Sequence, residues 1–539
     1  MAIDRLGEAD PRNQFIAHLI HYAQTQSGHP QWTIERCLAG GKHRASDGSE
    51  HSDVEYDGEV RTAAGIVRGK WENAVAVFRG IPYAQPPVGA LRFAAPAAAR
   101  SWDGIRDALE FGPSVPQANA VSGGDCLTLN VWSPDLGAAG LPVLVWIHGG
   151  KYLEGTSGNP HHDGTTLARS GVVVVNMNYR VGAEGFAHID GAPDNRGILD
   201  QVAALRWVQD NVAAFGGDPG NVTVFGQSAG AGCIAALLAM PVAAGLFRRA
   251  IAQSVPGTYF TPRLAAAIST TIAAEAGVHS TVDELAHISP RALIDATEAV
   301  IQKMPAHVAS WGPTALTPTP FSPVVDGDVL PSAPWQALAA GAARGIDLLV
   351  GHTRDEYRLF NTQMGNEVTD EQVTATLELL APASDEDYRT AYPEAGPGHL
   401  YELVNADWLF RMPSLHLANA HHAGGGRAWT YELCWSFNPA QGASHSLDNL
   451  LVFGTLSLDE VRSYGGPTAV DEARHVGHEM RTDWLNFAST GHPGWTPYEP
   501  DTRSTRVYTA EPSIKTYPEE LSHRIWRTHR FDVQDLRTE

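Results

Sequence analysis

The chain has 539 residues, of which 43% are hydrophobic, enough to build a large buried core. Its 60 acidic and 38 basic residues give a formal net charge of -22, which disfavours nucleic acid and anionic membrane surfaces as partners. No apolar run approaches the roughly 18 residues that a membrane-spanning helix needs, so neither a nucleic-acid-binding nor a membrane-spanning protein is expected.

Residues 1–58 are predicted to be an N-terminal extension. Residues 13–24 place apolar side chains at helical spacing, which predicts one amphipathic helix. Residues 40–53 are polar and rich in Gly and Ser, as in a linker. The N-terminus lacks a basic segment followed by an apolar one, so no secretory signal is expected. The folded body is therefore predicted to span residues 59–539.

From residue 60 the body alternates short strands with helices, which predicts an α/β fold with a mostly parallel central sheet and helices on both faces. Residues 141–147 and 171–176 are continuous apolar runs, as expected for inner strands. Apolar positions in residues 197–212 recur at spacings of three and four, which indicates an amphipathic helix. Further strands are predicted at 64–69, 75–80, 127–132, 222–225, 346–350 and 428–433, and further helices at 231–240, 264–276, 290–303, 370–379 and 415–423. The segments around 262–320 and 365–425 are interpreted as helical insertions beside the sheet.

The motif Gly226-Gln227-Ser228-Ala229-Gly230 lies between a predicted strand and a predicted helix. It has the G-x-S-x-G pattern of the nucleophile elbow of α/β-hydrolases, in which a strained turn exposes the serine Oγ. Small flanking residues let the strand and the helix pack closely around that turn. Gly and Ser are common, so the pattern alone is weak, but its setting favours Ser228 as a nucleophile.

A nucleophilic serine needs a base and an orienting acid, which in this fold follow it in the order acid, then histidine. The turn after the predicted strand 346–350 carries Asp355 and Glu356; a solvated ion cluster with Arg354 is the alternative interpretation. His445 follows in a loop ahead of an apolar segment. The chain has 23 histidines, and the pairs 161–162 and 421–422 are interpreted as surface features. The residues alone leave the choice between Asp355 and Glu356 open.

The loop Gly149-Gly150-Lys151-Tyr152 follows the predicted strand 141–147. Glycines allow backbone N–H groups to turn towards a developing oxyanion, and a simple tight turn is the alternative. Six residues are candidates for lining a substrate pocket, although each could equally belong to the hydrophobic core. They are Tyr152, Gln227, Phe321, Trp408, Phe410 and Met412.

Several longer motifs occur in a fixed order along the chain. They are Phe78-Arg-Gly-Ile-Pro-Tyr-Ala-Gln-Pro-Pro-Val-Gly-Ala-Leu-Arg-Phe, Asp125-Cys-Leu-Thr-Leu-Asn-Val-Trp, Asn195-Arg-Gly-Ile-Leu-Asp-Gln, Phe215-Gly-Gly-Asp-Pro-Gly-Asn and Pro323-Val-Val-Asp-Gly. With these motifs the chain closely resembles the type B carboxylesterases, the cholinesterase-like α/β-hydrolases, over roughly residues 60–510.

The resemblance implies a serine esterase that cleaves small-molecule carboxylic esters in two steps through an acyl-enzyme. Ser228 would be the nucleophile and His445 the general base and then acid, with Glu356, rather than Asp355, orienting the imidazole. The oxyanion hole would use the N–H groups of Gly150, Lys151 and Ala229, in a loop shaped by Gly149. No cofactor or metal is expected, because the chain has no nucleotide-binding glycine motif and no H-E-x-x-H.

The chain departs from the family pattern at three positions near the expected site. Lys151 stands where a third small residue is frequent, Gln227 where Glu is frequent, and Tyr357 where a small residue commonly follows the catalytic acid. We hypothesise that the Lys151 cation favours substrates that carry an acid group. Equal activity of a Lys151→Ala variant on charged and neutral esters would contradict this.

The four cysteines, Cys37, Cys126, Cys233 and Cys434, are far apart and are interpreted as free thiols. Secreted relatives usually pair the cysteine that Cys126 matches, and here Val115 occupies the partner position, so a cytoplasmic, bacterial-type enzyme is expected. Cleavage of carbamates or amides by the same residues is the alternative function, and a non-catalytic binding protein on the same fold is a remote one. The sequence leaves the oligomeric state open.

Overall fold

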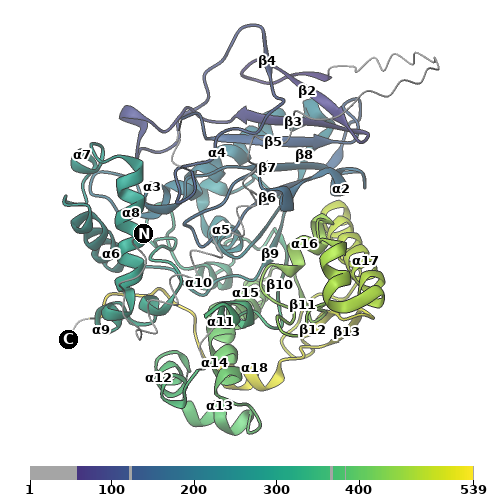
Figure 1. Cartoon of the computed structure of the whole chain (residues 1–539). Coiled ribbons are helices and arrows are strands. Elements are labelled where there is room, and N and C mark those ends of the chain that lie inside the picture. Colours follow the sequence, from purple (N-terminus) through teal and green to yellow (C-terminus); the bar gives the residue numbers. More distant parts are fainter. Residues whose placement is uncertain (1–57, 121–123, 365–367, 383, 538–539) are drawn as a thin grey trace, which may run out of the picture.

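The computed structural model describes residues 58–120, 124–364, 368–382 and 384–537 (Figure 1). The predicted helix at 13–24 and the predicted linker lie outside these residues, as does Cys37.

One sheet of 13 strands runs through the described part of the chain, in the order β1-β2-β3-β5-β7-β6-β8-β9-β10-β11-β12-β13, with β4 beside β2. All neighbours from β7 to β12 are parallel, whereas the outer pairs of this order are antiparallel. The strands are β1 Gly58–Arg61, β2 Ile66–Glu72, β3 Val75–Pro82, β4 Ile105–Asp107, β5 Thr128–Ser133, β6 Leu141–Ile147, β7 Val173–Met177, β8 Gly217–Gln227, β9 Arg249–Gln253, β10 Asp347–Thr353, β11 Ala428–Leu433, β12 Ser504–Tyr508 and β13 Ser513–Thr516. The mostly parallel sheet predicted from the sequence is confirmed.

Helices cover both faces of this sheet. One face is covered by α4 Arg196–Asn211, α5 Ala229–Ala239, α10 Pro334–Ala339 and α15 Met412–Ala423, and the other by α2 Thr165–Ala168, α16 Leu447–Phe453 and α17 Leu458–Thr490. The remaining helices are α3 Gly182–Phe186, α6 Pro262–Glu275, α7 Val282–Leu285, α8 Pro290–Lys303, α9 Val308–Trp311, α11 Arg358–Met364, α12 Asp370–Leu380, α13 Asp385–Ala391, α14 Pro397–Ala406 and α18 Glu520–Trp526. The groups α6 to α9 and α11 to α14 stand beside the sheet as two separate clusters (Figure 1).

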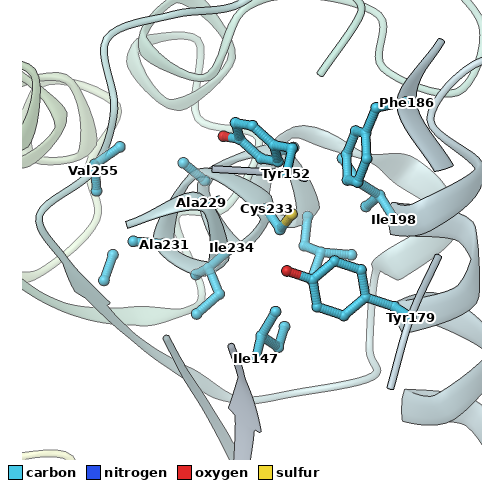
Figure 2. Close-up of a cluster of buried hydrophobic side chains, with 14 of the residues drawn as sticks. Ile147, Tyr152, Tyr179, Phe186, Ile198, Ala229, Ala231, Cys233, Ile234 and Val255 are labelled. Carbon is cyan, nitrogen blue, oxygen red and sulfur yellow. The ribbon is translucent and has the colours of Figure 1, made fainter. Parts of the chain in front are cut away.

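The side chains of the inner strands alternate between two hydrophobic cores, one on each face of the sheet. In β6, Val143, Val145 and Ile147 enter the core under α5, while Leu144 and Trp146 enter the core under α17. Figure 2 shows the first core, in which Ala229, Ala231, Cys233 and Ile234 of α5 pack among side chains from other elements. Because both faces are buried, these strands are apolar throughout, as the sequence predicted.

Among the described residues, Cys126, Cys233 and Cys434 are free thiols. In the part of the chain that the structure describes, no helix is long and apolar enough to cross a membrane.

Candidate active site

Ser228 occupies a tight turn between β8, at the centre of the sheet, and α5. Its φ of 56° and ψ of -126° lie outside the regions that non-glycine residues usually adopt, and such strain is typical of a nucleophile elbow. A Cβ at Gly226 or Gly230 would lie 2.6 or 2.1 Å from the carbonyl oxygen of Ile147. Only glycine at these two positions allows β6 to pass this close to the turn.

Glu356 follows β10 and is fully buried. Its Oε1 accepts hydrogen bonds from Ser254 Oγ at 2.5 Å and from the Thr353 N–H at 2.9 Å, and its Oε2 contacts Nδ1 of His445. Burial raises the pKa of this carboxyl, but the charge of His445 and the hydrogen bonds from His445 and Ser254 outweigh burial, and the pKa lies below its ordinary value. Glu356 is therefore an ionised acceptor for the Nδ1–H of the imidazole.

His445 lies in the loop between β11 and α16. Its ring packs against Phe410, with 4.4 Å between ring centroids, and against Phe360 at 5.7 Å. Its Nε2 is 2.9 Å from Nε2 of the buried Gln227 amide. Since Nδ1 faces the Glu356 carboxylate, the hydrogen of His445 is on Nδ1, and its Nε2 accepts from the amide of Gln227.

Ser228 Oγ and His445 Nε2 share no hydrogen bond among the described residues. The side chain next to the serine, Gln227, occupies Nε2 instead. Ser228 and His445 are thus linked through Gln227. Looser contacts of this kind are common in free enzymes and tighten when substrate is bound.

Asp355 connects the loop that carries Glu356 to the loop that carries His445. Its carboxylate forms ion pairs with Arg354 at 2.8 Å and Arg358 at 2.9 Å and accepts from the Ala443 N–H at 2.8 Å. The Asp355 N–H in turn donates to the Ala443 carbonyl at 3.0 Å. The geometry places Glu356 on the imidazole and gives Asp355 a part in holding the two loops together.

The glycine loop after β6 lies against the serine. A Cβ at Gly149 would be 3.2 Å from Cβ of Ser228, and one at Gly150 would be 2.1 Å from the Glu154 carbonyl oxygen. Gly150 has a φ of 118° and Lys151 a φ of 59°, so the backbone turns sharply here. Among the described residues, the N–H groups of Gly150 and Ala229 donate to no protein acceptor. This arrangement suits donors that bind an oxyanion.

A buried histidine supports the loop from behind. His148 stacks on Tyr179, with 4.3 Å between ring centroids, and its Nδ1 is 2.8 Å from the Gly149 carbonyl oxygen. Burial lowers the pKa of His148 to about 4, so its ring is neutral and donates to that oxygen. The stacking contact and this hydrogen bond stabilise the conformation of the loop.

The structure separates the candidate pocket residues into two sets. Gln227 and Phe410 contact His445. Tyr152, Phe321, Trp408 and Met412 are buried and remain predictions as pocket residues; Trp408 and Phe410 both lie in the π-helix Asp407–Arg411. Two contacts of the site were not anticipated: Phe360 on the imidazole, and Ser254 on Glu356. Ser254 directly follows the end of β9, and its place at the carboxyl end of an inner strand is the feature that would have indicated it.

The expected influence of Lys151 is changed by its surroundings. Its Nζ forms an ion pair with Glu154 at 3.1 Å, in a half-buried setting. The ammonium therefore has a neighbouring carboxylate, which reduces its expected attraction for acidic substrates; the hypothesis itself stays a prediction. Tyr357, another of the three unusual residues, is buried and packs against Phe360 and Tyr401.

Comparison with known proteins adds independent evidence. Residues 56–526 match the model of the carboxylesterase family. The chain is 37% identical over 486 residues to the para-nitrobenzyl esterase of Bacillus subtilis, which covers 85% of this chain and 96% of that protein. It is 34% identical over 456 residues to a phenmedipham hydrolase of Pseudarthrobacter oxydans, covering 80% of this chain and 90% of that protein. A solved carboxylesterase of Geobacillus stearothermophilus superimposes with a TM-score of 0.77 at 34% identity, covering 87% of this chain and 99% of the other.

Proposed function

The chain belongs to the carboxylesterase family, and we propose that this carboxylic ester hydrolase works through a Ser228, His445 and Glu356 triad and an acyl-enzyme intermediate. The observation that carries the proposal is the contact of His445 Nδ1 with a buried, ionised Glu356, beside a serine held at a φ of 56°. The substrate is a small-molecule ester.

In the first step, His445 Nε2 leaves the amide of Gln227 and takes the proton of Ser228 Oγ as Oγ attacks the ester carbonyl. The tetrahedral oxyanion is bound by the N–H groups of Gly150, Lys151 and Ala229. The imidazolium then protonates the departing alcohol oxygen, and the acyl group remains on Ser228.

In the second step, the same imidazole removes a proton from water, which attacks the acyl-enzyme. The second tetrahedral intermediate uses the same donors, and its collapse releases the carboxylic acid and restores the Ser228 hydroxyl. Throughout both steps Glu356 keeps the hydrogen of the neutral ring on Nδ1 and stabilises the imidazolium that forms. The free thiols Cys126, Cys233 and Cys434 support the further proposal of a cytoplasmic, reducing location, which cell fractionation would test.

Labelling with an organophosphonate probe is expected to place one adduct on Ser228, because the probe reacts with an activated serine. The measurement is peptide mass spectrometry after stoichiometric inactivation, with loss of turnover of a short-chain p-nitrophenyl ester followed in parallel. Adduct on another residue, with full loss of activity, would contradict the assignment of the nucleophile. Matched anilides and carbamates in the same assay test the alternative function, cleavage of amides or carbamates.

Replacing Gln227 by Glu is expected to shift the acidic limb of the kcat/KM profile upward by about one pH unit or more. A carboxylate beside Nε2 of His445 stabilises the protonated imidazole. In that form Nε2 already carries a proton and cannot act as the general base, so a higher pH is needed for activity. The measurement is hydrolysis of a neutral ester across the acidic and neutral range. Gln209→Glu, on α4 and bonded to the Pro219 and Leu246 carbonyls, is the matched control, and an equal shift there would contradict a local effect.

A further inference from the structure

A cavity of about 410 Å³ begins at the glycine loop and extends towards α8. Lys151 joins it to the proposed site, since its backbone belongs to the oxyanion loop and its side chain lines the cavity. The same loop is tied to α3 by a hydrogen bond of 2.6 Å from the Gly182 N–H to the Tyr152 carbonyl, and Gly182 also lines the cavity. Lys151 is therefore the residue at which this cavity and the proposed oxyanion loop meet.

The wall opposite the loop is built by α8. Ser289 accepts from the Ala292 N–H at 3.2 Å, and Pro290 occupies the first turn, so the helix start is fixed. From this helix Leu293, Ile294 and Ile301 face the cavity, and α8 packs against α3, beside which it lies in Figure 1. A volume of this size with an apolar wall is suited to a small apolar or aromatic group.

The charged side chains that line the cavity are unbalanced. Four are carboxylates, those of Glu154, Glu184, Asp295 and Glu298, and one is the ammonium of Lys151. Three of the carboxylates have cationic partners: Glu154 pairs with Lys151 at 3.1 Å, Glu184 with Arg92 at 2.6 Å and Asp295 with Arg291 at 2.6 Å. Among the described residues Glu298 forms no ion pair. It is exposed, and the cation that influences its charge, Arg291, acts on it only at longer range because that guanidinium is paired with Asp295.

We propose that this cavity binds an ester arm with an apolar body and a cationic end, so that the enzyme prefers ammonium-bearing esters to neutral or acidic ones of the same shape. The inference rests on the proposed function. The apolar body would lie on α8, and the cation would face Glu298, the lining carboxylate that forms no ion pair among the described residues. A substrate arm with an acidic end would be repelled by Glu298, and the Lys151 ammonium is already paired with Glu154. The expected charge preference is therefore the opposite of the preference for acidic substrates that Lys151 alone suggests.

The test uses the full-length enzyme and benzyl acetates whose para substituent is trimethylammonio, tert-butyl or carboxylate. Methyl phenylacetates with the same three substituents cover the case in which the arm belongs to the acyl side. In at least one series kcat/KM should fall in the order ammonium, tert-butyl, carboxylate. Glu298→Gln should lower the ratio of ammonium to tert-butyl ester by about two- to five-fold, the range expected for an exposed charge pair.

Glu378→Gln is the matched control, because Glu378 is an exposed glutamate on α12 that does not line the cavity, and it should leave the ratio unchanged. A ratio at or below one in both series overturns the inference, while hydrolysis of the tert-butyl esters leaves the proposed function intact. A preference for the cation that Glu298→Gln does not reduce also overturns it, because attraction by the net charge of -22 would then suffice. Absence of turnover of every ester overturns the proposed function, and the inference with it.

Discussion

Ser228→Ala is expected to lower kcat for a short-chain p-nitrophenyl ester by about 10⁶-fold. Removal of Oγ eliminates the acyl-enzyme, and His445 and Glu356 then have no nucleophile to activate. The glycine loop and the binding of substrate remain, so hydrolysis above the uncatalysed rate by about 10³-fold should persist. The measurement is steady-state turnover with enzyme at high concentration, together with a search for the acyl-enzyme by intact-protein mass spectrometry.

Stability provides the control for this variant. Ala retains the Cβ of Ser228, so the backbone strain at a φ of 56° is the same in both proteins and thermal unfolding should change little. Ser463→Ala, an exposed position on α17, should keep full activity. Retention of more than a tenth of wild-type kcat in Ser228→Ala would contradict the proposed mechanism.

The inner strands could be predicted closely because their apolar character comes from burial on both faces. The predicted strand 141–147 coincides with β6, and 428–433 coincides with β11. The long helix α17 was missed. Its segment Gly465-Gly466-Pro467 contains three residues that disfavour helices, and Gly466 indeed adopts a φ of 74° at a kink. Burial of Met480, Trp484 and Phe487 against the sheet stabilises what local preference does not.

Strand β9 also has no local signal in the sequence. The contact of Ser254 with Glu356 was missed together with this strand, because Ser254 follows its last residue. The sequence of β9, Arg-Ala-Ile-Ala-Gln, has one β-branched residue and polar ends, so it shows neither a continuous apolar run nor clear alternation. Its pairing with β8 and β10 makes it a strand. Such pairing depends on residues far away in the chain, which a local pattern does not record.

The histidines show the same dependence on tertiary contacts. The interpretation of 421–422 as a surface pair was wrong for His421, which is buried and whose Nε2 is 2.9 Å from the Ile346 carbonyl oxygen. The interpretation of 161–162 was wrong for His162, which is half-buried and packs its ring against Trp146 and Phe453. The contact between Gln227 and His445 could not be predicted either, since it joins residues 218 positions apart.

The hydrogen bonds around Glu356 determine how the amide of a glutamine at this position would be oriented. The Thr353 N–H can only donate, so in Glu356→Gln the amide oxygen is drawn to Thr353, where Oε1 lies now. The amide NH₂ then faces His445 Nδ1, which must become an acceptor. The ring hydrogen moves to Nε2, and the base that should receive the Ser228 proton is already protonated.

Glu356→Gln is therefore expected to reduce kcat by about 10⁴-fold with little change in KM, because the tautomer is wrong and the imidazolium has lost its counter-charge. Asp355→Asn is the matched control: its amide oxygen can still accept from the Ala443 N–H, so a loss of less than about ten-fold is expected, accompanied by lower thermal stability from the weakened pairs with Arg354 and Arg358. The comparison uses kcat for one neutral ester and the thermal midpoint of each variant. A greater loss of kcat in Asp355→Asn than in Glu356→Gln would transfer the orienting role to Asp355 and contradict the proposed triad.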